Sequence, residues 1–320
     1  LSRLAEVSLG AMFGLACEEV SRKYGIEGRL RGLAVIGAGK LGGRELTYGS
    51  DLDILFVYDE ERAASPPGGL TPFELFSKVA EKTISYLTAI TREGFAYRVD
   101  TRLRPTGSKG TLVQSIRGFR NYYSGQAETW ERQALVNGRF VAGDAGVGKD
   151  FICTIEELIY RQADRTALAG AVLAMRKRME EELGKEDASR YNIKQGYGGL
   201  VDIEFLAQYL QLVHGKERRW VRVPGAYNAL RALRKEGLLA LPEYRILVQA
   251  YLFIRMLESR MRIVTNQSTN DLSRDPKKLR PLARRLGYED DALTAGEKLL
   301  RNYERVRKEV REAFERVVRG

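Results

Sequence analysis

The segment Gly49-Ser-Asp-Leu-Asp53 limits what this chain can fold into more than any other, because it leads directly into an apolar run. Residues 54–58 (ILFVY) are rich in aromatic and β-branched side chains, which predicts a buried strand over 51–58. Side chains alternate between the two faces of a strand, so we expect Asp51 and Asp53 on one face and Leu52 in the core. Two adjacent carboxylates repel each other unless a cation lies between them, and Mg²⁺ prefers such oxygen ligands.

A third carboxylate, that of Asp100, ends a second short strand that we predict over 95–100. Three acidic residues on neighbouring strands could hold two metal ions roughly 3.5–4 Å apart, as in-line displacement at phosphorus requires. Arg102 and Arg104 share strand parity with Asp100, which predicts that they reach phosphate oxygens beside the metals. The alternatives are a solvated Asp-x-Asp turn and arginines that serve as surface ion-pair partners.

Glycines and basic residues precede these carboxylates. Gly49 permits close approach of the backbone to a ligand, and Ser50 offers a hydroxyl and an N–H to a phosphate. The pattern G-x-G-x-x-G at 37–42 also matches a dinucleotide-binding turn, but too few residues follow for a crossover helix. We therefore expect a glycine-rich segment close to bound phosphates, with Lys40 and Arg44 as charge donors.

The order of expected elements predicts a mixed α+β domain over 1–145 and a helical domain over 146–320. Expected helices of the first part lie at 3–26, 72–92, 115–124 and 126–137, and its strands at 32–37, 51–58, 95–100, 110–114 and 139–142. From residue 151 onward the periodicity is almost exclusively helical, which indicates a bundle of six or seven helices. The segment 143–149 resembles a P-loop, but Asp150 stands where Ser or Thr is required, so a flexible linker is the preferred interpretation.

Composition narrows the classes of function. A net charge of +11 favours anionic partners such as nucleotides, nucleic acid or an acidic protein, without deciding between them. The sequence contains no apolar run of 18 residues, so no membrane span is indicated. The two cysteines lie far apart, which suits a reducing cytoplasm. The single histidine, His214, makes a histidine-based triad or zinc site improbable. The chain begins with Leu rather than Met, which suggests a domain of something longer.

Several long sequence words closely resemble the glutamine synthetase adenylyltransferase family, whose members are polymerase-beta-like nucleotidyltransferases. These words are GKLGGREL at 39–46, GSDLDILFVYD at 49–59, YRVDTRLRPTGSKGTLVQS at 97–115, ETWERQALV at 128–136 and IKQGYGGLVDIEFLAQYLQL at 193–212. The resemblance implies a nucleotidyltransferase core with a mixed sheet, followed by an all-helical bundle. It also implies that Asp51, Asp53 and Asp100 bind metal and that Gly49 and Ser50 contact nucleotide phosphates.

Members of this family often carry two homologous halves, one adding AMP from ATP to a tyrosine of glutamine synthetase and one removing it by phosphorolysis. The words AETWERQALV at 127–136 and GGLVDIEF at 198–205 are more similar to the adenylylating half. Asp202 and Glu204 lie in the second of these words, and the resemblance suggests a supporting or substrate role for them. The alternative makes both a solvated face of a bundle helix.

The resemblance implies Mg²⁺ as cofactor, ATP as substrate, glutamine synthetase as protein substrate and the PII signal protein as regulator. A nucleic-acid nucleotidyltransferase of the same superfamily is a second possibility that the basic charge permits, although no groove of aromatic and basic residues stands out. A non-catalytic regulatory module is a third, which the intact set of three carboxylates disfavours.

Overall fold

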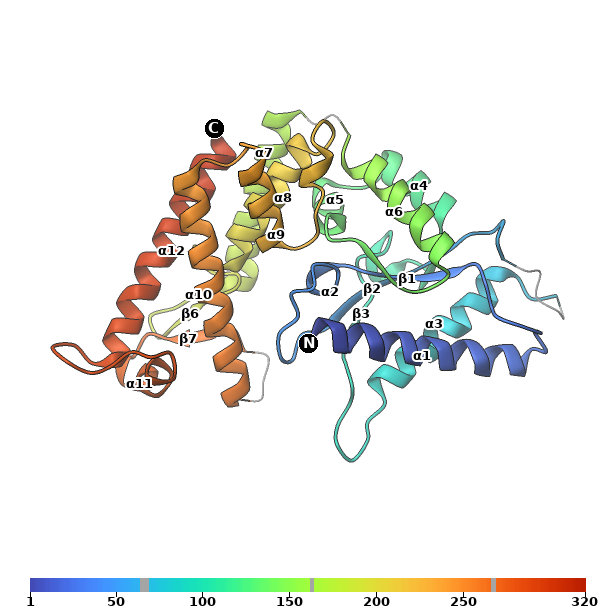
Figure 1. Ribbon diagram of the computed structural model, residues 1–320, viewed down its shortest axis with the longest axis horizontal. Coiled ribbons are helices and arrows are strands. Elements are labelled where there is room, and N and C mark those ends of the chain that lie inside the picture. Colours follow the sequence, from blue (N-terminus) through green and yellow to red (C-terminus); the bar gives the residue numbers. More distant parts are fainter. Residues whose placement is uncertain (64–68, 162–163, 266–268) are drawn as a thin grey trace. The chain divides into compact units, whose positions relative to one another are not determined.

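The computed structural model describes residues 1–63, 69–161, 164–265 and 269–320, and these form two compact units (Figure 1). The first unit comprises 1–46 and 50–161, and the second comprises 47–49 and 162–320. The sequence placed the boundary at 145, directly before helix α6 (Ala145–Ile159). This helix packs against strands of the first unit through buried side chains such as Phe151 and Ile155, so the first unit continues to Arg161.

A five-stranded mixed sheet forms the centre of the first unit. Its strands are β1 (Leu33–Gly37), β2 (Leu52–Tyr58), β3 (Val99–Asp100), β4 (Val113–Ser115) and β5 (Arg139–Gly143). The order is β3-β2-β1-β5, and β4 also pairs with β2. β1 is antiparallel to β2 and β5, whereas β3 and β4 are parallel to β2. The mixed α+β class is confirmed, and antiparallel pairing of β1 with β2 excludes the parallel dinucleotide-binding arrangement.

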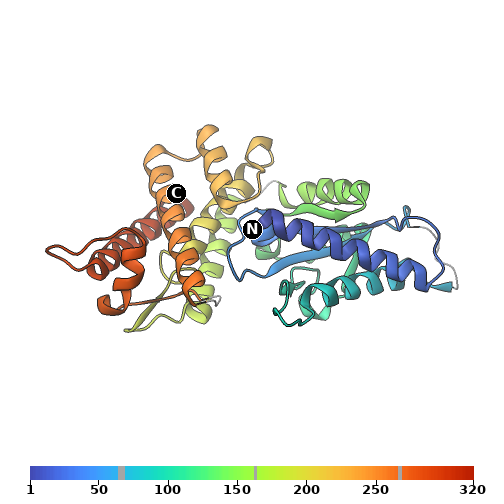
Figure 2. The same ribbon diagram turned by 60° about the horizontal axis from the view of Figure 1, so that its bottom comes forward.

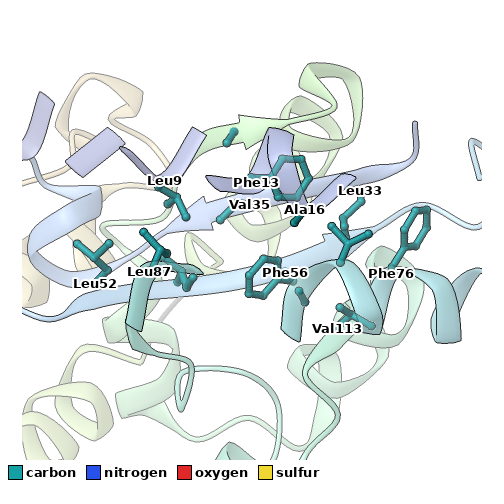
Figure 3. Close-up of a cluster of buried hydrophobic side chains, with 14 of the residues drawn as sticks. Leu9, Phe13, Ala16, Leu33, Val35, Leu52, Phe56, Phe76, Leu87 and Val113 are labelled. Atoms are coloured by element: carbon teal, nitrogen blue, oxygen red, sulfur yellow. The ribbon is translucent and has the colours of Figure 1, made fainter. Parts of the chain in front are cut away.

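Helices α1 (Ser2–Lys23) and α3 (Pro72–Thr88) cover one face of this sheet (Figure 3). α3 begins at a capping box formed by Thr71 and Glu74, a device that stabilises a helix by about 1 kcal/mol. Every second residue of β2 joins the apolar core beneath the helices, namely Leu52, Ile54, Phe56 and Tyr58. The residues between them, Asp53 among them, therefore lie on the opposite face.

The opposite face carries α6 (Figure 2). This helix packs against α4 (Ile116–Gly125) and α5 (Thr129–Leu135). Asp144 caps α6: its carboxylate accepts bonds from the N–H groups of Gly146 and Val147, and also from that of Gly32. The P-loop-like segment is thus the end of β5 and the first turn of a packed helix. The interpretation of this segment as a flexible linker was wrong. In the sequence, an aspartate that caps a helix looks the same as an aspartate in a loop.

The second unit is largely helical. Its elements are α7 (Arg165–Met179), a π-turn at Glu180–Gly184, α8 (Leu200–His214), a short 3-10 turn at Arg219–Val221, α9 (Ala226–Lys235), α10 (Leu241–Thr265), α11 (Pro276–Arg285) and α12 (Ala295–Arg319). Two short strands, β6 (Arg190–Asn192) and β7 (Asp271–Ser273), pair antiparallel and were not predicted. Three-residue strands more than 70 residues apart leave no periodic signal. No helix in the described part of the chain is long and apolar enough to cross a membrane.

Candidate functional site

Strands β2 and β3 bring Asp53 and Asp100 side by side. In their parallel pairing, Leu52 is opposite Val99 and Asp53 is opposite Asp100, and the Leu52 N–H donates to the Arg98 carbonyl at 2.9 Å. Leu52 is fully buried and Asp53 partly exposed, as the predicted alternation requires. Like charges in register destabilise a sheet unless a cation offsets them. The register therefore places two carboxylates next to each other at the start of β2, where a nearby positive charge would relieve their repulsion.

Asp51 adds a further negative charge to this group, and Arg102 adds a positive one. Asp51 lies directly before β2 and is exposed. The Arg102 Nε lies 3.0 Å from each Asp100 oxygen, its Nη2 lies 2.5 Å from Oδ2, and its backbone N–H donates to Oδ1 at 2.8 Å. These bonds lower the pKa of Asp100. The pKa of Arg102 is raised by its bonds to Asp100, and further by the charges of Asp53 and Asp51, so all three carboxylates act on one guanidinium.

Arg104 has a different environment from the one we expected. β3 ends at Asp100 and a turn follows, so strand alternation places neither Arg102 nor Arg104. The Arg104 guanidinium donates to the backbone carbonyls of Thr101 at 2.8 Å, Gly110 at 3.1 Å and Ser108 at 3.3 Å. Its partial burial lowers its pKa. Arg104 thus closes the loop between β3 and β4, and its donors already have acceptors within that loop.

The glycine-rich segment packs directly against Asp53. It forms one helical turn, α2 (Gly39–Gly42), and the preceding Ala38 N–H donates to the Asp53 carbonyl at 2.9 Å. Gly39 has φ +48°, and a β-carbon there would overlap the Asp53 carboxylate. Glycine at position 39 is therefore needed for the carboxylate to occupy its place. We expected this segment near phosphates, and the structure places it beside the carboxylates.

Lys40, Gly49 and Ser50 are the remaining predicted phosphate contacts. Lys40 lies within α2 and is partly exposed. Gly49 is exposed with φ +65°, a left-handed conformation that favours glycine, and Ser50 follows it, partly exposed. Chain connectivity places Ser50 next to Asp51. Gly49 and Ser50 are therefore sequence neighbours of Asp51, and Lys40 belongs to the turn that packs on Asp53.

Arg139 supports the glycine-rich turn and was not identified from the sequence. Its Nε donates to the Gly42 carbonyl at 3.0 Å and its Nη2 to the Leu41 carbonyl at 3.0 Å, while Nη2 also lies 2.5 Å from the Glu6 carboxylate. Glu6 in turn pairs with Arg44, at 2.9 Å, so the Arg44 side chain is engaged in an ion pair. The contacts join positions about 100 residues apart, and no local pattern in the sequence could reveal them.

The donors at this site match the preferences of Mg²⁺, although they are not yet gathered around a common centre. In the described ranges, no group of three or more His, Cys, Asp or Glu side chains is arranged to hold a metal ion. Asp53 and Asp100 nevertheless present carboxylate oxygens from adjacent strands, with Asp51 two residues away, and hard divalent cations favour such ligands. Strand register and donor chemistry fit the ion, whereas the Asp100 oxygens currently accept bonds from Arg102.

Asp202 belongs to a buried cluster in the second unit. It is fully buried on α8, where it bonds Arg176, pairs with the Arg311 Nε at 3.1 Å and accepts the Gly198 N–H at 2.9 Å. With both oxygens engaged and no exposed surface, it offers no atom to a substrate. Glu204, two residues along the same helix, is partly exposed. The alternative of a solvated face does not apply to Asp202.

Comparison with known protein families gives two matches along the chain. Residues 1–153 match the family model described as glutamate-ammonia ligase adenylyltransferase. Residues 173–318 match the model described as GlnD PII-uridylyltransferase. The boundary between the two matches falls near the end of α6, close to where the first compact unit ends.

Curated relatives carry the name bifunctional glutamine synthetase adenylyltransferase/adenylyl-removing enzyme. The relative from Chromobacterium violaceum is 44% identical over 68% of this chain and 23% of its own length. The Nitrosococcus oceani relative is 38% identical over 84% of this chain and 29% of its own length. The Methylococcus capsulatus relative is 32% identical over 99% of this chain and 33% of its own length. This chain thus spans a third or less of the length of these relatives. It belongs to the glutamine synthetase adenylyltransferase family.

Proposed function

We propose that this chain catalyses Mg²⁺-dependent transfer of AMP from ATP to a tyrosine of glutamine synthetase. The observation that carries the proposal is the register of β2 and β3, which sets Asp53 beside Asp100. Such a pair attracts cations, and the family is one of nucleotidyltransferases. The names of the relatives supply the protein substrate. Of the expected phosphate contacts, Gly49 and Ser50 directly precede Asp51, and Lys40 lies in the turn whose Gly39 packs against Asp53.

The carboxylates Asp51, Asp53 and Asp100 would hold Mg²⁺, which when bound offsets charge on the triphosphate and makes the attacking hydroxyl more acidic. Gly39 keeps space for the Asp53 carboxylate, since any larger residue would overlap it. Arg104 contributes indirectly by closing the loop that follows Asp100.

The nucleotide would be oriented by the residues on either side of these carboxylates. Gly49 would let the backbone approach the phosphates, and Ser50 would donate to a phosphate oxygen. Lys40 and Arg102 would offset negative charge that develops during transfer. Of Asp202 and Glu204, only Glu204 reaches the surface of α8, so it is the one we propose for contact with substrate.

The adenylylating direction is favoured by the words at 127–136 and 198–205. The opposite direction, phosphorolytic removal of AMP, uses the same carboxylates and is the main rival, because the relatives are named for both activities. As part of this proposal, the reaction takes place in the cytoplasm under regulation by the PII signal protein.

One experiment tests both chemistry and direction. The full chain is mixed with ATP, Mg²⁺ and unmodified glutamine synthetase, and separately with adenylylated synthetase and phosphate, and mass spectrometry reports gain or loss of AMP. The Asp53→Asn variant is expected to lose at least about 100-fold in rate, because a metal contributes several kcal/mol and each 1.36 kcal/mol is tenfold. Asp59→Asn, just beyond the far end of β2, is the matched control and should stay within about twofold.

Wild-type transfer by Asp53→Asn would contradict the assignment of the carboxylates. Loss of AMP from the modified synthetase, without any gain on the unmodified one, would reverse the direction and leave the site assignment intact.

A further inference from the structure

The Arg102 side chain bonds a carboxylate, that of Asp100, which the proposed function gives to the metal. Its Nε bridges both Asp100 oxygens at 3.0 Å, and its Nη2 adds a bond of 2.5 Å to Oδ2. Its backbone N–H occupies Oδ1 as well, at 2.8 Å. Both oxygens of Asp100 are therefore engaged by the same residue, through a planar fork that matches a carboxylate.

The position of Arg102 also suits the other two carboxylates. Asp53 stands opposite Asp100 in the strand pairing, and Asp51 precedes it by two residues. The carboxylates of Asp53 and Asp51 both interact electrostatically with the Arg102 guanidinium. The guanidinium therefore provides the counter-charge that two acidic side chains in register require, in the place where the proposed function puts a divalent cation.

We propose that Arg102 is an internal counter-cation that competes with the divalent metal for Asp100 and turns to the nucleotide phosphates when the metal displaces it. This proposal rests on the proposed function. A metal that ligates Asp100 must take oxygens that now accept bonds from Arg102, so binding of one cation requires departure of the other.

Exposure makes this exchange feasible. The Arg102 side chain is 78% exposed, whereas that of Asp100 is 19% exposed. An ion pair with so exposed a partner contributes little net stability, because water readily solvates the released guanidinium. The competition should therefore weaken metal binding by a few-fold without preventing it. Once released, the same planar fork can bind phosphate oxygens, which couples metal entry to engagement of the triphosphate.

The test measures Mn²⁺ binding to the full chain without nucleotide, by electron paramagnetic resonance or calorimetry. Arg102→Gln is expected to bind Mn²⁺ about three- to fivefold more tightly than wild type, and at the same time to raise the KM for ATP. Arg98→Gln is the matched control, since Arg98 is an exposed arginine of the same segment that stacks on the Phe95 ring at 5.4 Å. Its Mn²⁺ affinity should equal that of wild type.

The outcomes separate this proposal from the proposed function. If Asp53→Asn abolishes Mn²⁺ binding but Arg102→Gln leaves the affinity unchanged or weaker, the metal site stands and the competition is overturned. An equal gain in Arg98→Gln would also overturn it, because the effect would then be one of net charge. If Mn²⁺ binding does not depend on Asp53, both proposals fail.

Discussion

Two clusters of aspartate and arginine occupy different surroundings in this molecule. In the first unit, Asp100 pairs with Arg102, whose side chain is largely exposed. In the second unit, Asp202 is fully buried and bonds Arg176, itself only 1% exposed, and Arg311. Sequence patterns suggested a functional role for both aspartates. Burial distinguishes them: Asp100 is paired with an arginine that is open to water, whereas Asp202 has no exposed surface.

Energetics explains this difference. An exposed ion pair contributes about 0–1 kcal/mol, so its loss is cheap and its partners remain available to ligands. Removing one member of a buried pair costs about 3–5 kcal/mol, because the remaining charge has no water to solvate it. The Asp202 cluster is therefore suited to hold α7, α8 and α12 together, whereas the exposed Asp100–Arg102 pair adds little to stability.

The largest expected effect on stability comes from Asp202→Asn. The substitution removes the buried carboxylate that joins Arg176 to Arg311 and leaves the partly exposed Glu180 to pair with both, so the free energy of unfolding should fall by about 3–5 kcal/mol. Urea denaturation followed by circular dichroism measures this loss. Asp271→Asn, which removes an ion pair to Arg190 whose partners are each 43% exposed, should cost less than about 1 kcal/mol. Equal losses in the two variants would remove the distinction between buried and exposed clusters.

A smaller effect is expected for Gly39→Ala. Residue 39 has a left-handed conformation and no room for a β-carbon beside Asp53, so the variant should lose about 1–3 kcal/mol of stability and most of its transfer activity. Gly14→Ala in α1 is the control, because a β-carbon there meets open space and alanine favours a helix by up to about 1 kcal/mol. Denaturation and transfer assays on the same samples test both parts. Full activity in Gly39→Ala would show that the glycine does not position Asp53.

A modest pH effect should come from Asp100. Its pKa is lowered in the folded protein by the bonds from Arg102, so the pair stabilises the fold above the ordinary carboxyl pKa. This contribution is lost as the pH falls below about 4 and through the lowered pKa, and exposure limits it to about 1 kcal/mol or less. Melting temperatures between pH 5 and pH 3 should fall slightly more steeply for wild type than for Asp100→Asn. Identical slopes would mean that Arg102 does not stabilise the charged form of Asp100.

The smallest effect concerns the two thiols of the first unit, of which one is partly buried and the other exposed. Burial raises the pKa of Cys17 to about 12, whereas Cys153 is exposed on α6. At pH 8 a thiol-reactive dye should label one site rapidly, and Cys153→Ser should abolish that rapid phase. Denaturant should then expose Cys17. Rapid labelling of the Cys153→Ser variant in native buffer would show that Cys17 is accessible.

Local patterns allowed much of the first unit to be predicted. Alternation along β2 identified Leu52 as core and Asp53 as the residue facing away from it, and the structure agrees. Parallel pairing of β2 with β3 could not be predicted, because Asp100 lies 47 positions after Asp53 and only two residues form the strand.

Other features depend on contacts that the type of a residue does not reveal. Arg104 carries the charge expected of a phosphate ligand, but its bonds go to loop carbonyls. Aspartate occurs both in loops and at helix starts, so only the bonds that Asp144 accepts from the first turn of α6 identify it as a cap. The burial of Asp202 depends on arginines from two other helices, which no spacing within α8 indicates.

The proposed function depends on a divalent cation held between Asp53 and Asp100. Crystals of the full chain grown with Mn²⁺ and a non-hydrolysable ATP analogue would locate the ion by anomalous diffraction. We predict a peak within ligand distance of an oxygen from each of these two carboxylates, with Arg102 turned away from Asp100. Bound analogue with the manganese peak elsewhere, and both carboxylates away from it, would contradict the account.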